Sequence, residues 1–179
     1  MTKWNSRGHR GDKLENLVLL SNEYYKANKL GRIDKVDVPI KVIKKTENGM
    51  IVKAFFEKKS TVDFHGVIQG MPIVFDAKET LLKSLPVQNI HKHQLEYMKD
   101  INYQGGLSFI IIHFKVYDEY FLVPFEIVWK YYLDSKNGKR KSIPYKDMNP
   151  IFKIHREMNG ILNYLPILNN YVKWKKAQI

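Results

Sequence analysis

The chain contains no cysteine among its 179 residues. Disulfide bonds and cysteine-based zinc sites are therefore excluded, which fits a reducing compartment. It also lacks a long apolar run, because the longest one, around Leu107 to Phe114, is too short to cross a bilayer. The first residues carry no apolar segment of the kind found in secretory signal peptides. We therefore expect a cytoplasmic protein with no membrane partner.

Acidic residues are scarce relative to basic ones. The chain has 30 Lys and Arg against 18 Asp and Glu, which gives a formal net charge of +12. Such an excess commonly serves a polyanion, most often nucleic acid, but a generic basic surface would give the same balance. The apolar share of 44% is that of an ordinary globular protein, and the length fits one core. We therefore treat residues 1–179 as a single domain.

Basic residues gather in two segments near the start of the chain. Residues 1–10 are polar and predict a flexible basic arm. Residues 36–58 combine extended patterns with Asn48-Gly49, a strong turn signal, and predict a protruding β-hairpin, the stalk hairpin. Its lysines fit either a polyanion or a solvated edge that resists aggregation. The lysines of the hairpin and its flanks are Lys35, Lys41, Lys44, Lys45, Lys53 and Lys58.

The rest of the chain alternates between helical and strand patterns. Apolar residues at helical spacing predict helices over residues 12–30, 89–101 and 163–175, with a further helix that opens at Pro124. Apolar and β-branched runs predict strands around residues 61–67, 72–78, 107–112 and 120–123. This order predicts an α/β fold in which helices flank a mixed central sheet.

Two carboxylates and a lysine fall on one predicted pair of strands. Side chains repeat every second residue along a strand, so Asp76 and Lys78 share a face, and the neighbouring strand can bring Asp63 beside them. Mg²⁺ prefers oxygen ligands and usually takes one or two carboxylates from the protein. A bound divalent cation activates water for attack on a phosphodiester, and Lys78 would either orient the attacking water or stabilise the transition state. Alone, the pattern fits an exposed salt-bridged strand face equally well.

These residues belong to a longer set of motifs that resembles a known family. The likeness runs from about Arg10 to Phe121 and is to the RecU Holliday junction resolvases, within the PD-(D/E)XK nuclease superfamily of restriction-endonuclease-like folds. The motifs that carry it are Arg10-Gly11-x-x-Leu14-Glu15, Ser60-Thr61-x-Asp63, Phe75-x-Ala77-Lys78-Glu79-Thr80 and His91-x-His93-Gln94.

The resemblance implies a homodimeric endonuclease that cuts four-way DNA junctions by paired symmetric nicks during recombination and repair. It implies Mg²⁺ as cofactor, with Mn²⁺ as the alternative, bound by Thr61, Asp63, Asp76 and Gln94. Catalysis would fall to Asp63, Asp76 and Lys78, with Glu15 in support. The stalk hairpin would enter the junction centre, and the DNA contacts would be Arg7, Arg10, Lys41, Lys44, Lys45 and Lys53.

Four points stay open at this stage. One alternative function is a catalytically silent protein that binds junction DNA, and another is a related nuclease that acts on a different DNA substrate. Recombination or branch-migration proteins are candidate partners, and a phage-borne gene is as compatible with the sequence as a chromosomal one. The family often has Glu where this chain has Asp76, so the shorter carboxylate would hold the metal slightly differently.

Overall fold

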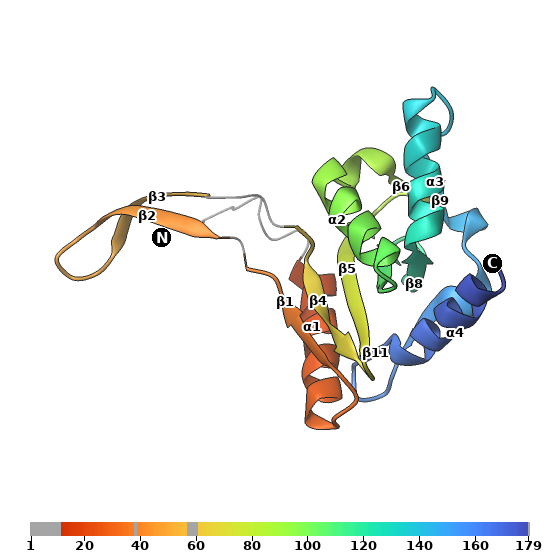
Figure 1. The fold of residues 1–179 in the computed structure, drawn as a ribbon, viewed down its shortest axis with the longest axis horizontal. Helices are drawn as coiled ribbons and strands as arrows, with labels where there is room; N and C mark the ends of the chain where they lie inside the picture. Colours follow the sequence, from red (N-terminus) through yellow and green to blue (C-terminus); the bar gives the residue numbers. More distant parts are fainter. Residues whose placement is uncertain (1–11, 38, 57–60, 179) are drawn as a thin grey trace.

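The computed structural model describes residues 12–37, 39–56 and 61–178. Its body is a seven-stranded sheet with the order β1-β4-β5-β7-β8-β10-β11 (Figure 1). Only β5 and β7 pair in parallel, and the other neighbours are antiparallel, which confirms the predicted mixed sheet. The strands are β1 (Arg32–Lys35), β4 (Phe64–Ile68), β5 (Met71–Thr80), β7 (Leu107–Phe114), β8 (Glu119–Pro124), β10 (Lys153–Arg156) and β11 (Leu162–Asn163).

Helices cover both faces of this sheet. Apolar side chains of α1 (Asp12–Ala27) and α4 (Leu165–Lys176) belong to the core on one face. Those of α2 (Lys92–Tyr103) and α3 (Phe125–Lys136) belong to the core on the other. All four predicted helices are therefore confirmed, although α2 begins later than expected because residues 87–89 form a separate 3₁₀ turn, η2. In the described part of the chain, no helix is both long and apolar enough to span a membrane.

The centre of the sheet is held by an apolar strand and an aromatic stack. Every residue of β7 is buried, as its β-branched run predicted. The ring of Phe75 on β5 lies between Phe64 on β4 and Phe109 on β7, with centroid separations of 4.9 and 4.7 Å. Because the three rings stack across three neighbouring strands, a slip in register would break the stack and move each side chain to the other face.

Strand β1 pairs with β4 and approaches its backbone most closely at Gly66. A Cβ atom at this position would lie 2.1 Å from the carbonyl oxygen of Arg32, so no other residue fits without a backbone shift. Gly66 pairs with Ile33, a buried residue of β1. The sequence did not predict β1, because only one of its four residues is buried and the apolar pattern is correspondingly weak.

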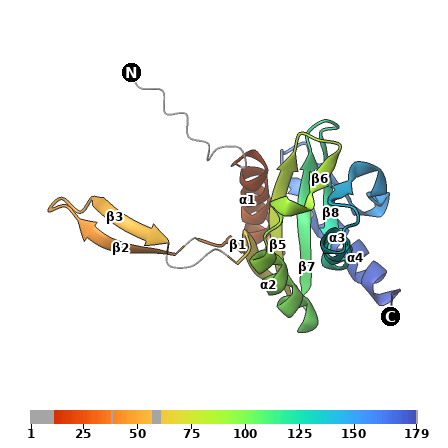
Figure 2. The ribbon, with the colours of Figure 1, turned by 90° about the horizontal axis from the view of Figure 1, so that it is seen from above.

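The stalk hairpin forms as predicted and stands away from the body (Figures 1 and 2). Its strands β2 (Ile40–Lys45) and β3 (Ile51–Phe56) make a separate two-stranded sheet. At the predicted turn, Gly49 has a φ of +80°, and the Thr46 amide donates to the Met50 carbonyl at 2.8 Å. A third small sheet pairs β6 (Ser84–Pro86) with β9 (Ser142–Pro144) and lies beside α2 and α3.

Candidate metal centre and nucleic-acid interface

The strand register brings the two predicted carboxylates together. β4 and β5 pair antiparallel with Phe64 opposite Phe75, so continuing the register by one residue sets Asp63 opposite Asp76. The turn between these strands is tight, with φ values of 48° at Gln69 and 81° at Gly70. Such a two-residue turn with positive φ at both positions matches the twist of the flanking strands and fixes the register.

Each carboxylate accepts a backbone N–H from the opposite strand. The Asp63 amide donates to Oδ1 of Asp76 at 2.8 Å, and the Ala77 amide donates to Oδ2 of Asp63 at 3.0 Å. The side chain of Asp76 is fully buried, whereas that of Asp63 keeps 22% of its surface exposed. The reciprocal bonds hold the two side chains in place where the backbone ladder ends at Phe64.

Lys78 supplies the countercharge. Its Nζ lies 2.9 Å from Oδ2 of Asp76 and 3.9 Å from Oδ2 of Asp63. Burial lowers the pKa of Lys78, but the carboxylates of Asp76 and Asp63 outweigh it, so its pKa is raised and the ammonium stays charged. Burial, followed by the charge of Asp76, raises the pKa of the Asp63 carboxyl. The site therefore concentrates more negative charge than one lysine fully balances.

Glu15 reaches this region from α1 and forms its closest ion pair with Lys35. Oε2 of Glu15 lies 2.6 Å from Nζ of Lys35, at the end of β1. The charge of Glu15 contributes to the raised pKa of Lys78, and that of Lys35 acts on Asp63. Lys35 is a site residue that sequence reasoning missed, because it was counted with the lysines that flank the stalk hairpin. No local signal pointed to it, since the pattern of β1 is too weak to predict that strand.

The available donors suit a hard divalent cation. In the described ranges, no three His, Cys, Asp or Glu side chains cluster closely enough to hold a metal. A cation at Asp63 and Asp76 would therefore complete its shell with neutral oxygens and water, as Mg²⁺ does. Oδ2 of Asp76 is enclosed and receives no well-aligned hydrogen bond from the described residues, although Lys78 lies beside it as an ion pair. Such an oxygen is a natural cation ligand.

The two predicted neutral ligands lie in different settings. Thr61 is exposed just ahead of Asp63. Gln94 is buried in the first turn of α2, where its Oε1 accepts the His91 amide at 3.1 Å. An amide oxygen has a second lone pair, so this capping bond leaves Gln94 able to act as a ligand. Their roles as metal ligands stay predictions.

Comparison with known proteins shows which family the chain belongs to. The family model described as RecU, recombination protein U, matches residues 9–170. The chain belongs to the RecU family. It is 37% identical over 172 residues to the Holliday junction resolvase RecU of Limosilactobacillus reuteri, covering 93% of this chain and 84% of that protein. It is also 37% identical over 174 residues to the protein of that name from Staphylococcus carnosus, with coverages of 92% and 82%.

A solved structure is also similar to this chain. It is that of Archaeoglobus fulgidus Hjc, a Holliday junction resolvase from an archaeal hyperthermophile, at 12% identity. The match covers 65% of this chain and 73% of that one with a TM-score of 0.40. The RecU family assignment rests on the sequence matches alone.

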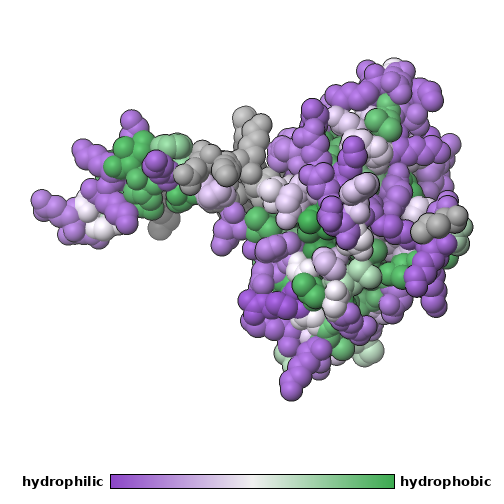
Figure 3. Space-filling model, in the orientation of Figure 1, coloured by the Kyte–Doolittle hydropathy of each residue, from purple (hydrophilic) through white to green (hydrophobic). Residues whose placement is uncertain are grey.

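For a RecU family member, the predicted DNA-contacting residues fall into two groups. Arg7 and Arg10 lie outside the described residues. The hairpin lysines are all exposed, on a ribbon that also carries exposed apolar residues, visible as a green patch in Figure 3. The hairpin lysines are Lys41, Lys44, Lys45 and Lys53, and the most exposed apolar side chains are Ile40, Ile43, Met50, Ile51, Val52 and Phe55.

Two residues of the motif Phe75-x-Ala77-Lys78-Glu79-Thr80 make contacts within the protein instead of facing solvent. Glu79 and Thr80 are the last two residues of β5. The side chain of Glu79 is only 6% exposed and forms an ion pair with Lys115. Thr80 is buried and its hydroxyl donates to the Ser84 carbonyl at 3.0 Å. Both side chains therefore stabilise the end of β5.

Proposed function

We propose that this protein is a metal-dependent endonuclease that cuts four-way DNA junctions. The observation that carries the proposal is the pair Asp63 and Asp76, joined by reciprocal hydrogen bonds and flanked by Lys78. The arrangement occurs in a chain that is 37% identical to proteins named Holliday junction resolvases. A silent binding protein would have no need of a buried, charged cluster that is costly to maintain.

The chemistry follows from the charges in the site. Asp63 and Asp76, with Thr61 and Gln94, would hold Mg²⁺, which would supply positive charge to the phosphoryl oxygens and would make a water molecule more acidic. Lys78 holds a proton and a positive charge next to the position of the reacting phosphate, where negative charge develops in the transition state. Glu15 and Lys35 position each other at the edge of this charge cluster.

Two copies of the chain would act together. A junction with two-fold symmetry needs two nicks related by that symmetry, which two identical sites supply. An isolated two-stranded ribbon is at best marginally stable in water, and the stalk hairpin exposes apolar residues such as Ile51 and Phe55. Covering these residues with the hairpin of a second copy would stabilise the ribbon and leave its lysines at the rim for DNA.

The decisive experiment is cleavage of a labelled four-way junction by Asp76→Asn. The amide keeps an oxygen to accept the Asp63 N–H, so the fold should be preserved while a charged ligand is lost. We expect junction binding within about twofold of the original protein and a loss of Mg²⁺-dependent cleavage of at least roughly a hundredfold. The matched control is Asp147→Asn, an acid that contacts Tyr131 and Arg140 well away from the site.

Other outcomes separate the alternatives. Undiminished cleavage by Asp76→Asn would overturn the assigned site. Equal cutting of linear duplex and junction by the unaltered protein would favour a nuclease with a broader DNA substrate. Binding of the junction without any cleavage over a series of Mg²⁺ and Mn²⁺ concentrations would favour the silent binding protein.

A further inference from the structure

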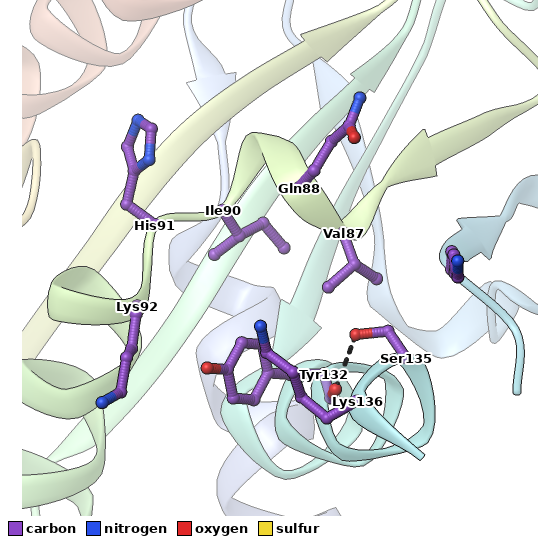
Figure 4. A pocket seen from close by; sticks show the side chains of 9 residues that line it. Val87, Gln88, Ile90, His91, Lys92, Tyr132, Ser135 and Lys136 are labelled. Carbon is purple, nitrogen blue, oxygen red and sulfur yellow. Dashed lines mark hydrogen bonds between the residues drawn. The ribbon is translucent and has the colours of Figure 1, made fainter. Parts of the chain in front are cut away.

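A basic pocket lies between η2 and the last turn of α3, outside the metal centre. It has a volume of about 320 Å³. Figure 4 shows its two walls: Val87 and Ile90 point down from the η2 segment, and Tyr132, Ser135 and Lys136 rise from α3. Its basic residues are His91, Lys92, Lys136 and Lys141, and none of its lining residues is acidic.

The positive charge of the pocket is weakly compensated. Among the residues that the structure describes, neither Lys136 nor Lys141 forms an ion pair, and Nζ of Lys136 lies 5.4 Å from the ring centroid of Tyr132. Lys92 pairs with Glu96 at 3.1 Å, but both side chains are largely exposed, so water screens this pair. The helix dipole places a partial negative charge at the end of α3, and Lys136 in the last turn compensates it. An anion would therefore find net positive charge.

The pocket shares an end of the molecule with the metal centre. His91 and Lys92 line it, and the same first turn of α2 carries Gln94, the predicted metal ligand. Figure 1 places the start of α2 and the end of α3 in the upper part of the body, while the stalk hairpin projects from its left side. A DNA strand that reaches Asp76 thus has a basic pocket close to its path.

We propose that this pocket binds backbone phosphate of a duplex arm of the substrate, away from the phosphate that is cut. The inference rests on the proposed function, because it assumes that DNA lies at the metal centre. Phosphate is the ligand that fits, since lysine ammonium groups are good donors to it and sequence-independent contacts suit a junction-directed enzyme. The apolar floor of Val87, Ile90 and Tyr132 excludes water from one side and strengthens these contacts.

The test is junction binding by the double variant Lys136→Ala with Lys141→Ala, in Ca²⁺ to prevent cutting. The matched control is Lys173→Ala with Lys176→Ala, which removes the same charge from exposed positions of α4, on the opposite face of the sheet. We expect the pocket variant to lose about tenfold in affinity, and its slope of log affinity against log salt to fall by about two. The control should change neither by more than about twofold.

A second measurement identifies direct contact with the backbone. Blocks of neutral methylphosphonate linkages are moved along each junction arm, and one block should weaken binding of the unaltered protein but not of the pocket variant. The proposal would be overturned if no block weakened binding in this way. It would also be overturned if the control pair lost as much affinity as the pocket variant. A phosphate-induced NMR shift at the pocket together with unchanged junction binding would overturn it as well and would indicate a free anion as the ligand.

The proposed function and the pocket can fail separately. At saturating protein, every junction is bound whatever its affinity, so single-turnover cleavage with Mg²⁺ by the unaltered protein reports on the metal centre alone. If the unaltered protein cuts junctions but the pocket variant binds them normally, the pocket assignment is wrong and the function stands. If the unaltered protein does not cut junctions, the function is wrong whatever the pocket binds.

Discussion

At the residue scale, Lys78 has two opposing effects on the pair Asp63 and Asp76. Its ammonium group stabilises two carboxylates that would repel each other in a buried setting, but it also lies beside the oxygens that would bind the proposed metal ion. The pKa of Lys78 is raised by these carboxylates, so its stabilising charge is present at neutral pH. That contribution is complete below the pKa of a free lysine and is lost as the pH rises through the raised folded pKa.

We therefore predict that Lys78→Ala destabilises the protein and that Mg²⁺ restores part of the loss. Removing one partner of a buried ion pair costs about 3 kcal/mol, because the remaining charge is uncompensated. A divalent cation at Asp63 and Asp76 would replace the missing charge, so Mg²⁺ should raise the unfolding midpoint more in the variant than in the original protein. Calorimetry with and without Mg²⁺ measures both.

Lys115→Ala is the control for this prediction. Lys115 forms an ion pair with the buried carboxylate of Glu79, outside the metal centre. Its loss should destabilise the protein similarly, but a single enclosed carboxylate offers Mg²⁺ a poor site. An equal response of both variants to Mg²⁺ would contradict the assignment of Asp63 and Asp76 as a cation site.

The residues of the site could be predicted to different degrees. Asp63, Asp76 and Lys78 followed from strand alternation and short spacing, which are local properties of the chain. The Glu15–Lys35 pair could not be predicted, because it depends on how α1 packs against β1. The burial of Glu79 depends likewise on Lys115, which lies in the turn between β7 and β8, far from Glu79 in the sequence.

At the scale of elements, prediction worked where the pattern was strong. The stalk hairpin, the strand pair around Asp63 and all four helices came from turn signals and periodicity. Short strands with few buried residues, β1, β10 and β11, were missed, because partners distant in sequence select them rather than their own propensity. β11 is held to α1 by side chains: the Ser21 hydroxyl accepts the Leu162 amide at 2.8 Å and donates to the Leu17 carbonyl at 2.8 Å.

Ser21→Ala tests this connection between α1 and β11. Ser21 is fully buried, so its removal leaves the Leu162 N–H without an acceptor, at a cost of about 1–3 kcal/mol in the free energy of unfolding. The measurement is denaturant unfolding followed by circular dichroism. Ser135→Ala is the control, because the Ser135 hydroxyl makes only the helical bond to the Tyr132 carbonyl at 2.7 Å. If the free energy of unfolding falls by the same small amount in both variants, the Ser21 contact does not stabilise the packing of β11 against α1.

At the scale of the whole molecule, the body and the stalk hairpin are stabilised differently. The body has an apolar core on each face of its sheet. The hairpin is a separate two-stranded sheet with apolar side chains in solvent. Stability of the body should therefore be independent of association between copies, whereas order in the hairpin should depend on it.

We predict that Ile51→Ser with Phe55→Ser shifts the protein from dimer to monomer without unfolding the body. The two side chains are about half exposed, at 51% and 48%, and both belong to β3. Sedimentation velocity gives the association state, and junction products should change from paired nicks to single nicks. Val67→Ser with Leu81→Ser is the control, because these exposed apolar residues lie on the body. A dimer that survives the hairpin substitutions would refute the hairpin as its interface.

The stalk hairpin rejoins the body at the metal centre itself. The Val36 amide, on the chain that enters the hairpin, donates to the Asp63 carbonyl at 2.8 Å, on the chain that leaves it. Asp63 is therefore both a predicted metal ligand and the residue whose backbone joins the two chain segments at the base of the hairpin. If DNA contacts the hairpin as predicted, a force on the hairpin would act through this bond on the backbone of Asp63, so the load on the hairpin and the geometry of the proposed metal site would be coupled within one residue.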